Sequence, residues 1–283
     1  MLQLFIHCLG VFLNLVPDFS LSTLRIAGVL QRIAVVYGIA SLVVLNTGLW
    51  GQVSTALMLL IGYWLAMTWI PVLVHGSGIL TPEGNLAAYI DSRFLPGVKY
   101  QGTWDPEGLL STFPAVATTL LGVMAGHWLR SDRERESIAC GLFVGGWVML
   151  ATGSALDTWF PINKHIWTSS YVVYTAGAAL ILLAIFYYLC DVRGLSKWFY
   201  PAIVFGVNSI AVFVLAGILA DVLRVWRVAA GDEGLALKPW LFINVFSVWA
   251  TPLNASLAYA VSFVLVLFAI MAALYRFRIF VKI

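Results

Sequence analysis

The sequence predicts an all-α, polytopic integral membrane protein with about eight transmembrane helices in one bundle. Of the 283 residues, 61% are hydrophobic and only 10% are charged, and the mean hydropathy is +0.94. Soluble domains carry roughly 25% charged residues, so this composition excludes a soluble globular enzyme and a disordered chain. The apolar residues also come in runs of about 20, the length that crosses a bilayer.

Eight apolar segments are the expected spans. The first is short and opens at the initiator methionine, the second contains Gln31 and Arg32, and the remaining six are more continuous. We expect all of them to form a single transmembrane domain, residues 1–283. The segments are Leu2–Val16, Ile26–Leu45, Val53–Val74, Leu109–Leu129, Ile138–Leu156, Trp167–Leu189, Pro201–Leu223 and Ala255–Tyr275.

The distribution of Lys and Arg among the loops orients the helices. Eight alternating spans place the tight connections 46–52, 130–136 and 191–198 and the tail 276–283 on one side of the membrane. Together these segments carry eight Lys or Arg residues and four acidic residues. Short cytoplasmic loops favour Lys and Arg. We therefore expect a multi-pass protein of a bacterial inner (plasma) membrane with its C-terminus in the cytoplasm.

Charge and cysteine content exclude two further classes. The net charge of +3 is small and scattered, so no basic patch for nucleic acid is present. Cys8, Cys140 and Cys190 are far apart in the sequence, which is neither a disulfide framework nor a metal site. We expect them to be small buried residues, and we expect no bound metal.

The first polar cluster opens the second span, where charged groups are costly and often mark a site. Arg25 and Arg32 are seven residues apart, so on a helix they would stack on one face, roughly 10 Å apart. Gly28 between them would let a ligand approach, and Gln31 is adjacent. Two aligned guanidinium groups suit phosphates or carboxylates. The alternative is that Arg25 reaches the interface and Arg32 pairs with an acidic residue of another helix.

The second cluster precedes the fourth span. Asp105 followed by Pro106 is typical of a helix N-cap and first helical position, and Glu107 would then lie in the first turn, where the helix dipole favours negative charge. Capping alone therefore explains both carboxylates. Alternatively, Glu107 lies on one face with Ser111 and pairs with Arg32 or acts as a general base.

The third cluster enters the sixth span. Asn163 is a candidate helix cap, Lys164 a residue that reaches the interface, and Ser169 and Ser170 hydroxyls that bond back to the helix. The second, fourth and sixth spans all begin on the same side of the membrane. Their polar starts are therefore expected to line one cavity, with Asn208 of the seventh span at a compatible depth.

None of the four histidines is selected as a catalytic residue. His7 lies in the first span without polar neighbours in the sequence, His127 lies near the end of the fourth, and His75 and His165 lie in loops. The chain contains no glycine-rich phosphate loop, nucleophile elbow or paired metal ligands. The residues alone indicate a membrane protein with a polar cavity.

These clusters resemble the signatures of a known family. The segments Arg25-Ile-Ala-Gly-Val-Leu-Gln-Arg32, Trp104-Asp-Pro-Glu-Gly-Leu-Leu-Ser-Thr112 and Pro161-Ile-Asn-Lys-His-Ile-Trp-Thr-Ser-Ser170 are similar to those of the heparan-α-glucosaminide N-acetyltransferase family. The segments 206–209 and 275–283 also fit. One departure is Ala27, where the family usually has proline, and this change should only relax the helix start.

The resemblance implies a membrane enzyme that transfers acetyl from acetyl-CoA to an amino sugar or glycan end. It places Arg25, Gly28, Gln31 and Arg32 around the acetyl-CoA. It assigns the sugar side to the polar residues of the other clusters, with Asp105 and Glu107 as catalytic support and Asn163, Lys164, Ser169, Ser170 and Asn208 as binding residues. The family's catalytic histidine is expected upstream of Met1, in two spans that precede this chain's first.

Three functions remain open at this stage. The first is the acyltransferase. The second is a permease for N-acetylglucosamine or a related amino sugar, in which the same cavity is the translocation site; the absence of a clear sequence repeat favours the enzyme. The third is a non-catalytic, truncated membrane protein. The expected partners are membrane lipid and the small-molecule sugar, with no nucleic acid, and the oligomeric state is open, a homodimer included.

Overall fold

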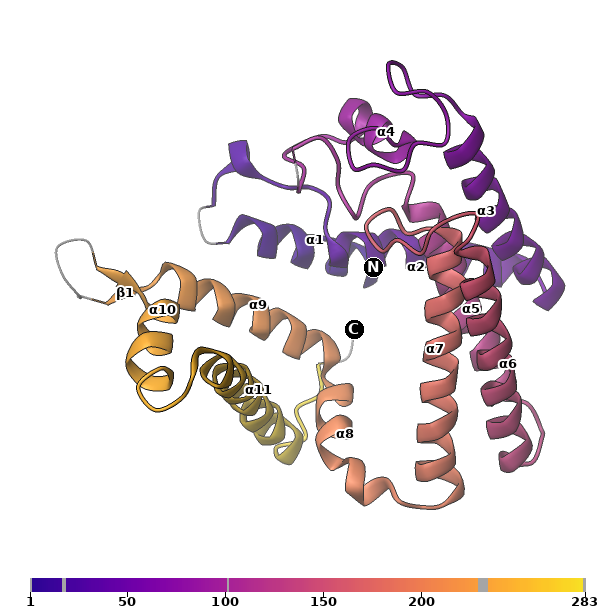
Figure 1. The fold of residues 1–283 in the computed structure, drawn as a ribbon. Helices are drawn as coiled ribbons and strands as arrows, with labels where there is room; N and C mark the ends of the chain where they lie inside the picture. Colours follow the sequence, from indigo (N-terminus) through magenta and orange to yellow (C-terminus); the bar gives the residue numbers. More distant parts are fainter. Residues whose placement is uncertain (1, 17–18, 101, 229–233, 282–283) are drawn as a thin grey trace. The chain divides into compact units, whose positions relative to one another are not determined.

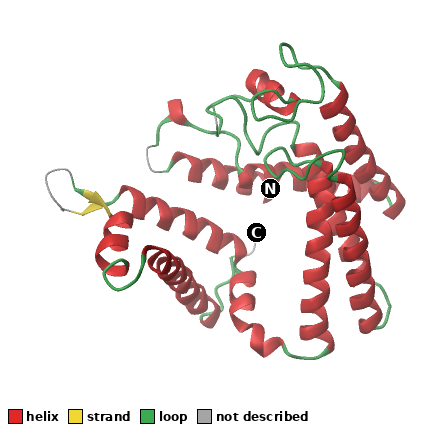
Figure 2. Ribbon diagram, in the orientation of Figure 1, coloured by secondary structure: helices red, strands yellow, loops and turns green. Residues whose placement is uncertain are grey.

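The computed structural model describes residues 2–16, 19–100, 102–228 and 234–281. Figures 1 and 2 show that helices dominate this part of the chain. The strands there are β1 (Arg227–Val228) and β2 (Leu235–Ala236), which pair antiparallel. The prediction of an all-α fold is therefore confirmed.

The chain forms two compact units. One consists of residues 1–14 and 21–196, and the other of residues 15–20 and 197–283. The first unit, called the N-terminal unit below, contains α1 (Leu2–Leu15), the 3₁₀ turn Leu21–Thr23, α2 (Val29–Asn46), α3 (Leu49–Trp69), α4 (Leu86–Phe94), α5 (Thr112–Leu129), α6 (Arg135–Leu156), α7 (Ser169–Tyr187) and the π-helical turn Tyr188–Val192.

The second unit is called the C-terminal unit below. It contains the 3₁₀ turn Ser196–Phe199, α8 (Tyr200–Val207), α9 (Ser209–Val225), β1 and β2, α10 (Leu237–Leu241), the π-helical turn Phe242–Phe246 and α11 (Pro252–Arg276). The long α11 is the most apolar of the candidate spans. Lys282 and Ile283 of the predicted basic tail lie outside the described residues.

Helices occupy all eight predicted spans, but not all of them are long enough to cross a membrane. By length and apolarity five described helices qualify, and six if the bent pair α8–α9 counts as one span. The first segment forms only the 14-residue α1. The fourth begins at Thr112 instead of Leu109, because the preceding residues are held in turns. The chain is nevertheless a multi-pass membrane protein.

The seventh predicted span is broken. Helices α8 and α9 meet at Asn208 with a bend of 71°. The backbone of Asn208 has φ −123° and ψ 39°, outside helical values. A continuous helix over Pro201–Leu223 is therefore the wrong prediction, and the side-chain bonds of Asn208 described below account for the break.

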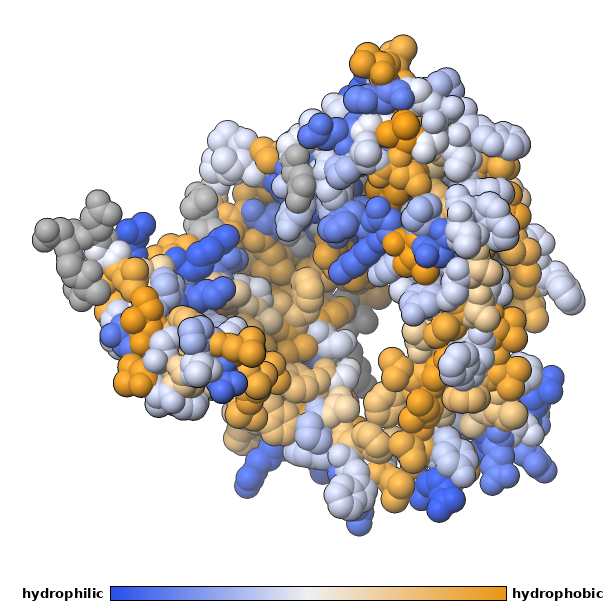
Figure 3. Space-filling model, viewed as in Figure 1, coloured by the Kyte–Doolittle hydropathy of each residue, from blue (hydrophilic) through white to orange (hydrophobic). Residues whose placement is uncertain are grey.

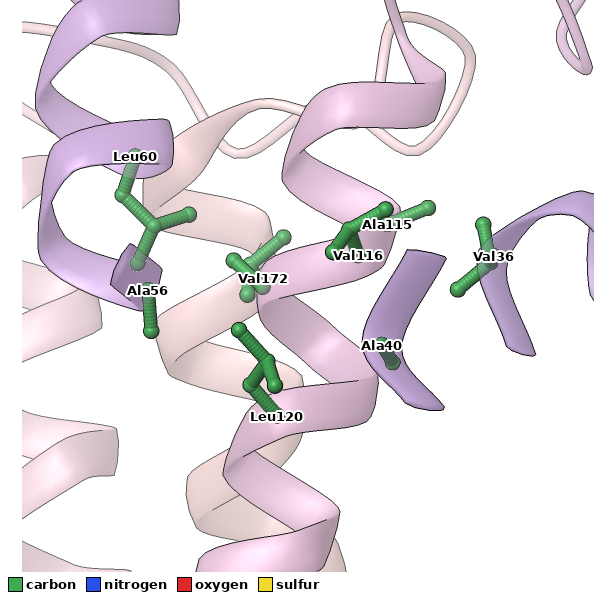
Figure 4. Packing of buried hydrophobic residues seen from close by; sticks show 9 residues of the cluster. Val36, Ala40, Ala56, Leu60, Ala115, Val116, Leu120 and Val172 are labelled. Atoms are coloured by element: carbon green, nitrogen blue, oxygen red, sulfur yellow. The ribbon is translucent and has the colours of Figure 1, made fainter. Parts of the chain in front are cut away.

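The core of the N-terminal unit lies where α2, α3, α5 and α7 meet. Leu120 and Val172 are fully buried there, next to Val116 and Leu60 (Figure 4). Large apolar side chains on the outer faces of the same helices are exposed, among them Leu42, and apolar residues cover much of the face in Figure 3. Such an exterior suits lipid contact.

The cysteines do not follow the prediction of burial. Cys8 and Cys140 are exposed, Cys190 is partly exposed, and all three are free thiols. Cys8 and Cys140 lie on faces of α1 and α6 that turn away from the core, where apolar residues meet lipid in a membrane protein.

Glycines allow α6 and α7 to pack closely along their length, as the side-by-side helices in Figure 1 show. A Cβ on Gly153 would lie 2.5 Å from the backbone nitrogen of Tyr174, and one on Gly177 would lie 2.5 Å from that of Leu150. Lipid provides no hydrophobic driving force between helices. Close packing through small residues stabilises such interfaces in its place.

This contact predicts opposite effects for two alanine substitutions in α6. Gly153→Ala should lower the melting temperature in detergent, because overpacking against backbone costs about 1–3 kcal/mol. A Cβ on Gly145 would meet no atom within 4 Å, so Gly145→Ala should leave the melting temperature unchanged or raise it through the better helix propensity of alanine. Equal effects of the two substitutions would contradict the close packing.

Candidate functional site

Arg25 lies before α2, not on it. Gly28 is the N-cap, in extended conformation, and the helix begins at Val29. The segment around Arg25 instead pairs with Gly97. Gly97 has a φ of +80°, and a Cβ on it would lie 2.7 Å from Leu24 O, so a side chain has no room there. The prediction that Arg25 and Arg32 stack on one helical face is therefore wrong.

The guanidinium of Arg25 binds both carboxylates of the second cluster. Its Nε donates to Asp105 Oδ2 at 2.7 Å, and its Nη2 lies 2.5 Å from both Asp105 Oδ1 and Glu107 Oε2. The side chain of Asp105 is fully buried, whereas that of Glu107 is 16% exposed. Glu107 therefore pairs with Arg25, not with Arg32 as the sequence suggested.

Arg32 binds backbone carbonyls of the same segment. Its Nη1 donates to Pro106 O at 2.7 Å and its Nη2 donates to Ser111 O. The guanidinium also lies over the ring of Trp167, 4.3 Å from its centroid, in cation–π geometry. The two arginines thus converge on one loop, residues 105–111, by different chemistry.

Asp105 does not cap α5, since that helix starts at Thr112 with Ser111 as its N-cap. Its carboxylate accepts instead from the backbone N–H of Tyr100 at 3.1 Å and of Glu107 at 3.0 Å. Burial acts to raise the pKa of Asp105, but the hydrogen bonds and charge of Arg25 outweigh it and hold the pKa below its ordinary value. Asp105 is therefore an anion that fixes the loop.

Asp91 of α4 is a member of this site that the sequence analysis missed. It is 1% exposed, and its Oδ1 accepts from Leu109 N at 2.9 Å. Gly108 packs so tightly on it that a Cβ there would lie 1.9 Å from Oδ2. Burial raises the pKa of Asp91 to about 6. An acidic residue directly after the apolar run Leu86–Ile90 was the available signal.

A cavity of about 500 Å³ lies beside this loop in the N-terminal unit. Its polar wall includes Gln31 and Arg32, which are 4% and 8% exposed. Gln31 Nε2 and Arg32 Nε are buried and have no hydrogen-bond partner within the described part of the chain. Because an unpaired buried donor is costly, these two groups mark where a ligand acceptor atom would be stabilised.

The remaining wall of the cavity combines polar and apolar groups. His7 of α1 belongs to it, although the sequence analysis did not select this histidine, and Glu107 and Gly28 belong to it as predicted. A Cβ on Gly28 would lie 2.5 Å from Gln31 Oε1, so this glycine lets the Gln31 amide pack against the backbone. Apolar residues complete the wall, among them Ile26, Val35, Ile39, Leu59, Leu109, Phe113 and Val116.

The third cluster does not share that cavity. Thr168, not Asn163, caps α7 by accepting from Tyr171 N. The Ser169 hydroxyl donates to Leu60 O at 2.7 Å, and the Ser170 hydroxyl pairs with Thr168, so neither bonds back to its own helix. Ser169 and Ser170 line a separate cavity of about 390 Å³.

The loop before α7 meets the arginines through one residue, Trp167, whose ring lies under Arg32. Asn163 Oδ1 accepts from His165 N at 2.9 Å, which stabilises a turn, and Lys164 is exposed. Ring contacts connect this third cluster to the other two polar clusters. The Trp167 ring contacts Arg32 of the first cluster, and His165 lies edge-on to Trp104 of the second, at 5.5 Å. The assignment of Asn163, Lys164, Ser169 and Ser170 to sugar binding stays a prediction.

Asn208 lies in the C-terminal unit and binds backbone. Its Nδ2 donates to Ile279 O at 3.1 Å, and its Oδ1 accepts from Val281 N at 2.8 Å. Its side-chain amide is thus engaged with the segment that follows α11. Because both ends of the amide are used in this way, the role predicted for Asn208 in binding substrate has no support in its contacts.

The geometry of the cavity suits polar recognition within an apolar site. Arg25, Arg32, Asp105 and Glu107 contribute two positive and two negative charges, so the loop is close to neutral. Gln31 and Arg32, the two residues with free donors, line a space bounded mainly by apolar side chains, and in such surroundings a hydrogen bond to a developing negative charge is strong. Among the described residues, no group of three or more His, Cys, Asp or Glu is placed to hold a metal.

Two curated proteins are similar to this chain. Heparan-alpha-glucosaminide N-acetyltransferase from Mus musculus is 30% identical over 270 residues, and that from Homo sapiens is 29% identical over 269. Each alignment takes in 73% of this chain. The chain belongs to the heparan-α-glucosaminide N-acetyltransferase family. It spans 40% of the length of these relatives, and no family model matches it.

In this member of the N-acetyltransferase family, two of the three motifs that carry the resemblance form one structure. The motif at residues 25–32 provides both arginines, and the motif at 104–112 provides every carboxylate and carbonyl group that they bind. The third motif, 161–170, contributes the Trp167 ring under Arg32.

The ion pairs predict a large cost for removing Arg25. Arg25→Gln should lower the free energy of unfolding by about 3–5 kcal/mol, because it leaves the buried Asp105 carboxylate without its cation. The measurement is chemical or thermal unfolding in detergent. As control, Arg93→Gln removes an exposed arginine that lies over the ring of Tyr89, at 5.0 Å, and should change stability little. Similar losses for both variants would contradict the role of Arg25.

Asp91 predicts a pH dependence of stability. Because folding raises the pKa of this carboxyl from 3.8 to about 6, the folded state binds the proton more tightly, and stability contributed by Asp91 falls as pH rises from about 4 to 6. The loss is at most about 3 kcal/mol. Asp91→Asn cannot ionise, so its melting temperature relative to wild type should increase over that range. A difference that stays constant with pH would refute the assignment.

Proposed function

We propose that this chain is a membrane-embedded acyltransferase that transfers an acetyl group from acetyl-CoA to the amino group of an amino sugar or glycan end. The supporting relationship is membership of the N-acetyltransferase family. The observation that carries the proposal is the cavity whose buried Gln31 and Arg32 donors have no partner in the described protein.

In this proposal the two free donors bind the thioester carbonyl of acetyl-CoA. The substrate amine attacks the carbonyl carbon, which forms the C–N bond and breaks the C–S bond. The amine loses a proton, and the coenzyme A thiolate leaves and takes one up. Gln31 Nε2 and Arg32 Nε would stabilise the oxyanion that forms between these events.

The proton acceptor proposed within this chain is His7. Imidazole is the usual general base, and His7 lines the same cavity as the two donors. Glu107 is less suited, because its charge is paired with Arg25. We assign Glu107, with Asp105, to supporting the loop, and Arg25 to holding both carboxylates instead of the donor.

An amino-sugar permease is the second candidate, favoured by one observation. The broken helix pair α8–α9, bent by 71°, is a device that transporters use to expose backbone polar groups within the membrane. Proteoliposomes containing the full chain separate the two functions. Transfer of label from radiolabelled acetyl-CoA to glucosamine supports the enzyme, whereas uptake of labelled N-acetylglucosamine without acetyl transfer supports the permease.

Gln31 gives the sharpest test of the cavity. Gln31→Leu removes a buried donor that has no partner among the described residues, so the melting temperature should stay the same or rise. The acetyl-transfer rate should fall by roughly 10²-fold, as for other lost oxyanion donors. A substitution that reduces activity by damaging the fold would lower the melting temperature as well, so the two explanations give different results.

The matched control is the other buried glutamine. Gln52 is 3% exposed and its Oε1 lies 3.1 Å from His127 Nε2, away from the cavity wall. Gln52→Leu should lower the melting temperature and leave the rate per folded molecule unchanged. A full acetyl-transfer rate for Gln31→Leu would remove this cavity from the proposal.

A further inference from the structure

The C-terminal unit has a cavity of its own at the end of α11, with a volume of about 700 Å³. Two arginines and three aromatic residues dominate its wall, which consists of Tyr200, Ala272, Ala273, Tyr275, Arg276, Arg278 and Phe280. We propose that this cavity, called the basic cavity below, binds a phosphate group. The inference depends on this unit alone and does not need the proposed acyl transfer.

The charge of the basic cavity is not compensated by the described protein. Within residues 197–228 and 234–281, Arg276 and Arg278 form no ion pair or side-chain hydrogen bond, and no acidic residue belongs to the wall. The described carboxylate of Asp221 is already bound to Arg224 at 2.8 Å. Two guanidinium groups at one cavity suit phosphate, which arginine binds through paired hydrogen bonds.

Backbone hydrogen bonds fix the main chain that carries the two arginines. Helix α11 ends with Arg278 N donating to Tyr275 O at 3.1 Å and Ile279 N donating to Leu274 O at 2.9 Å. Arg278 has a φ of +57°, a conformation that costs free energy for a residue other than glycine. The fully buried Asn208 then fixes the following segment through its bonds to Ile279 and Val281.

These bonds fix the backbone from which the two exposed arginine side chains extend, so that part of the ordering cost is already met before a ligand binds. Asn208 therefore has two structural roles. It lies at the bend between α8 and α9, and its side chain also fixes the position of residues 279–281.

The aromatic rings give the cavity a rigid wall beside the charges. Tyr200 of α8 meets Tyr275 edge-on at 5.8 Å, and Tyr275 meets Phe280 at 6.1 Å. Such a wall suits a ligand with an apolar or aromatic part next to its phosphate. Two sources of that chemistry are a membrane phospholipid, since Arg276 ends a candidate span, and the nucleotide part of coenzyme A.

Native mass spectrometry of the full chain in detergent tests both sources, with phosphatidylglycerol as one probe and coenzyme A as the other. The double variant Arg276→Gln/Arg278→Gln should bind the preferred probe at least about tenfold more weakly, as expected for lost charged hydrogen bonds. Arg276→Lys/Arg278→Lys keeps the charge but not the paired geometry, so it should restore only part of the affinity. If the glutamine variant loses binding of phosphatidylglycerol alone, the ligand of the cavity is a phospholipid. If it loses binding of coenzyme A alone, the ligand is the nucleotide part of coenzyme A.

Arg130→Gln/Arg133→Gln is the matched control. It removes the same charge from the loop between α5 and α6, where Arg133 lies over the ring of Trp128 at 4.3 Å, and the loop-charge pattern predicts that this loop and the end of α11 face the same side of the membrane. The control should leave binding of both probes unchanged.

Two results would overturn the proposal. One is an equal loss of binding in the control, which would indicate general attraction to a basic surface. The other is unchanged binding of both probes in Arg276→Gln/Arg278→Gln. Asn208→Ala gives an independent readout, because it loosens residues 279–281 without removing a charge, and it should weaken binding of the same probe.

Discussion

The N-terminal unit depends on the burial of one carboxylate. Asp105 has a side chain with no exposed surface, and a charge in that position is tolerated only with a closely paired cation and further hydrogen bonds. Arg25 supplies the cation and backbone N–H groups supply the bonds. That requirement explains why the chain before α2 is extended and paired with Gly97: a helical Arg25 would follow the axis of α2 instead of turning to the loop.

Once the loop is anchored, its carbonyl groups become ligands for a second arginine. Arg32 donates to Pro106 O and Ser111 O, and Asp91 holds the same loop from the other side through Leu109 N. The consequence is a guanidinium and a neighbouring amide fixed within an apolar wall, each with an unused donor among the described residues. This pair of buried, unpaired donors is the feature on which the proposed acyl transfer depends.

The two units use buried amides in opposite ways. Asn208 is fully buried and satisfied, because both ends of its side chain bind the backbone of the C-terminal segment. Gln31 is almost as buried, yet its amide nitrogen has no partner within the described chain. A satisfied amide organises the chain around it, as the bend of α8–α9 and the anchored backbone of Ile279 and Val281 show. An unsatisfied one is costly to the fold and is therefore the better indicator of a binding site.

The sequence by itself determined the fold class, the position of most helices, the family and the three segments that carry its motifs, because apolar runs and clustered polar residues are local properties of the chain. It could not determine that Arg25 leaves the helix, that Glu107 pairs with Arg25, or that Thr168 caps α7, since each depends on which of several competing partners is nearest in space. It did not select Asp91 or His7, because neither residue belongs to one of the three polar clusters. Only the tertiary structure decided these points, because burial and hydrogen-bond satisfaction are properties of the packed chain and not of any one segment.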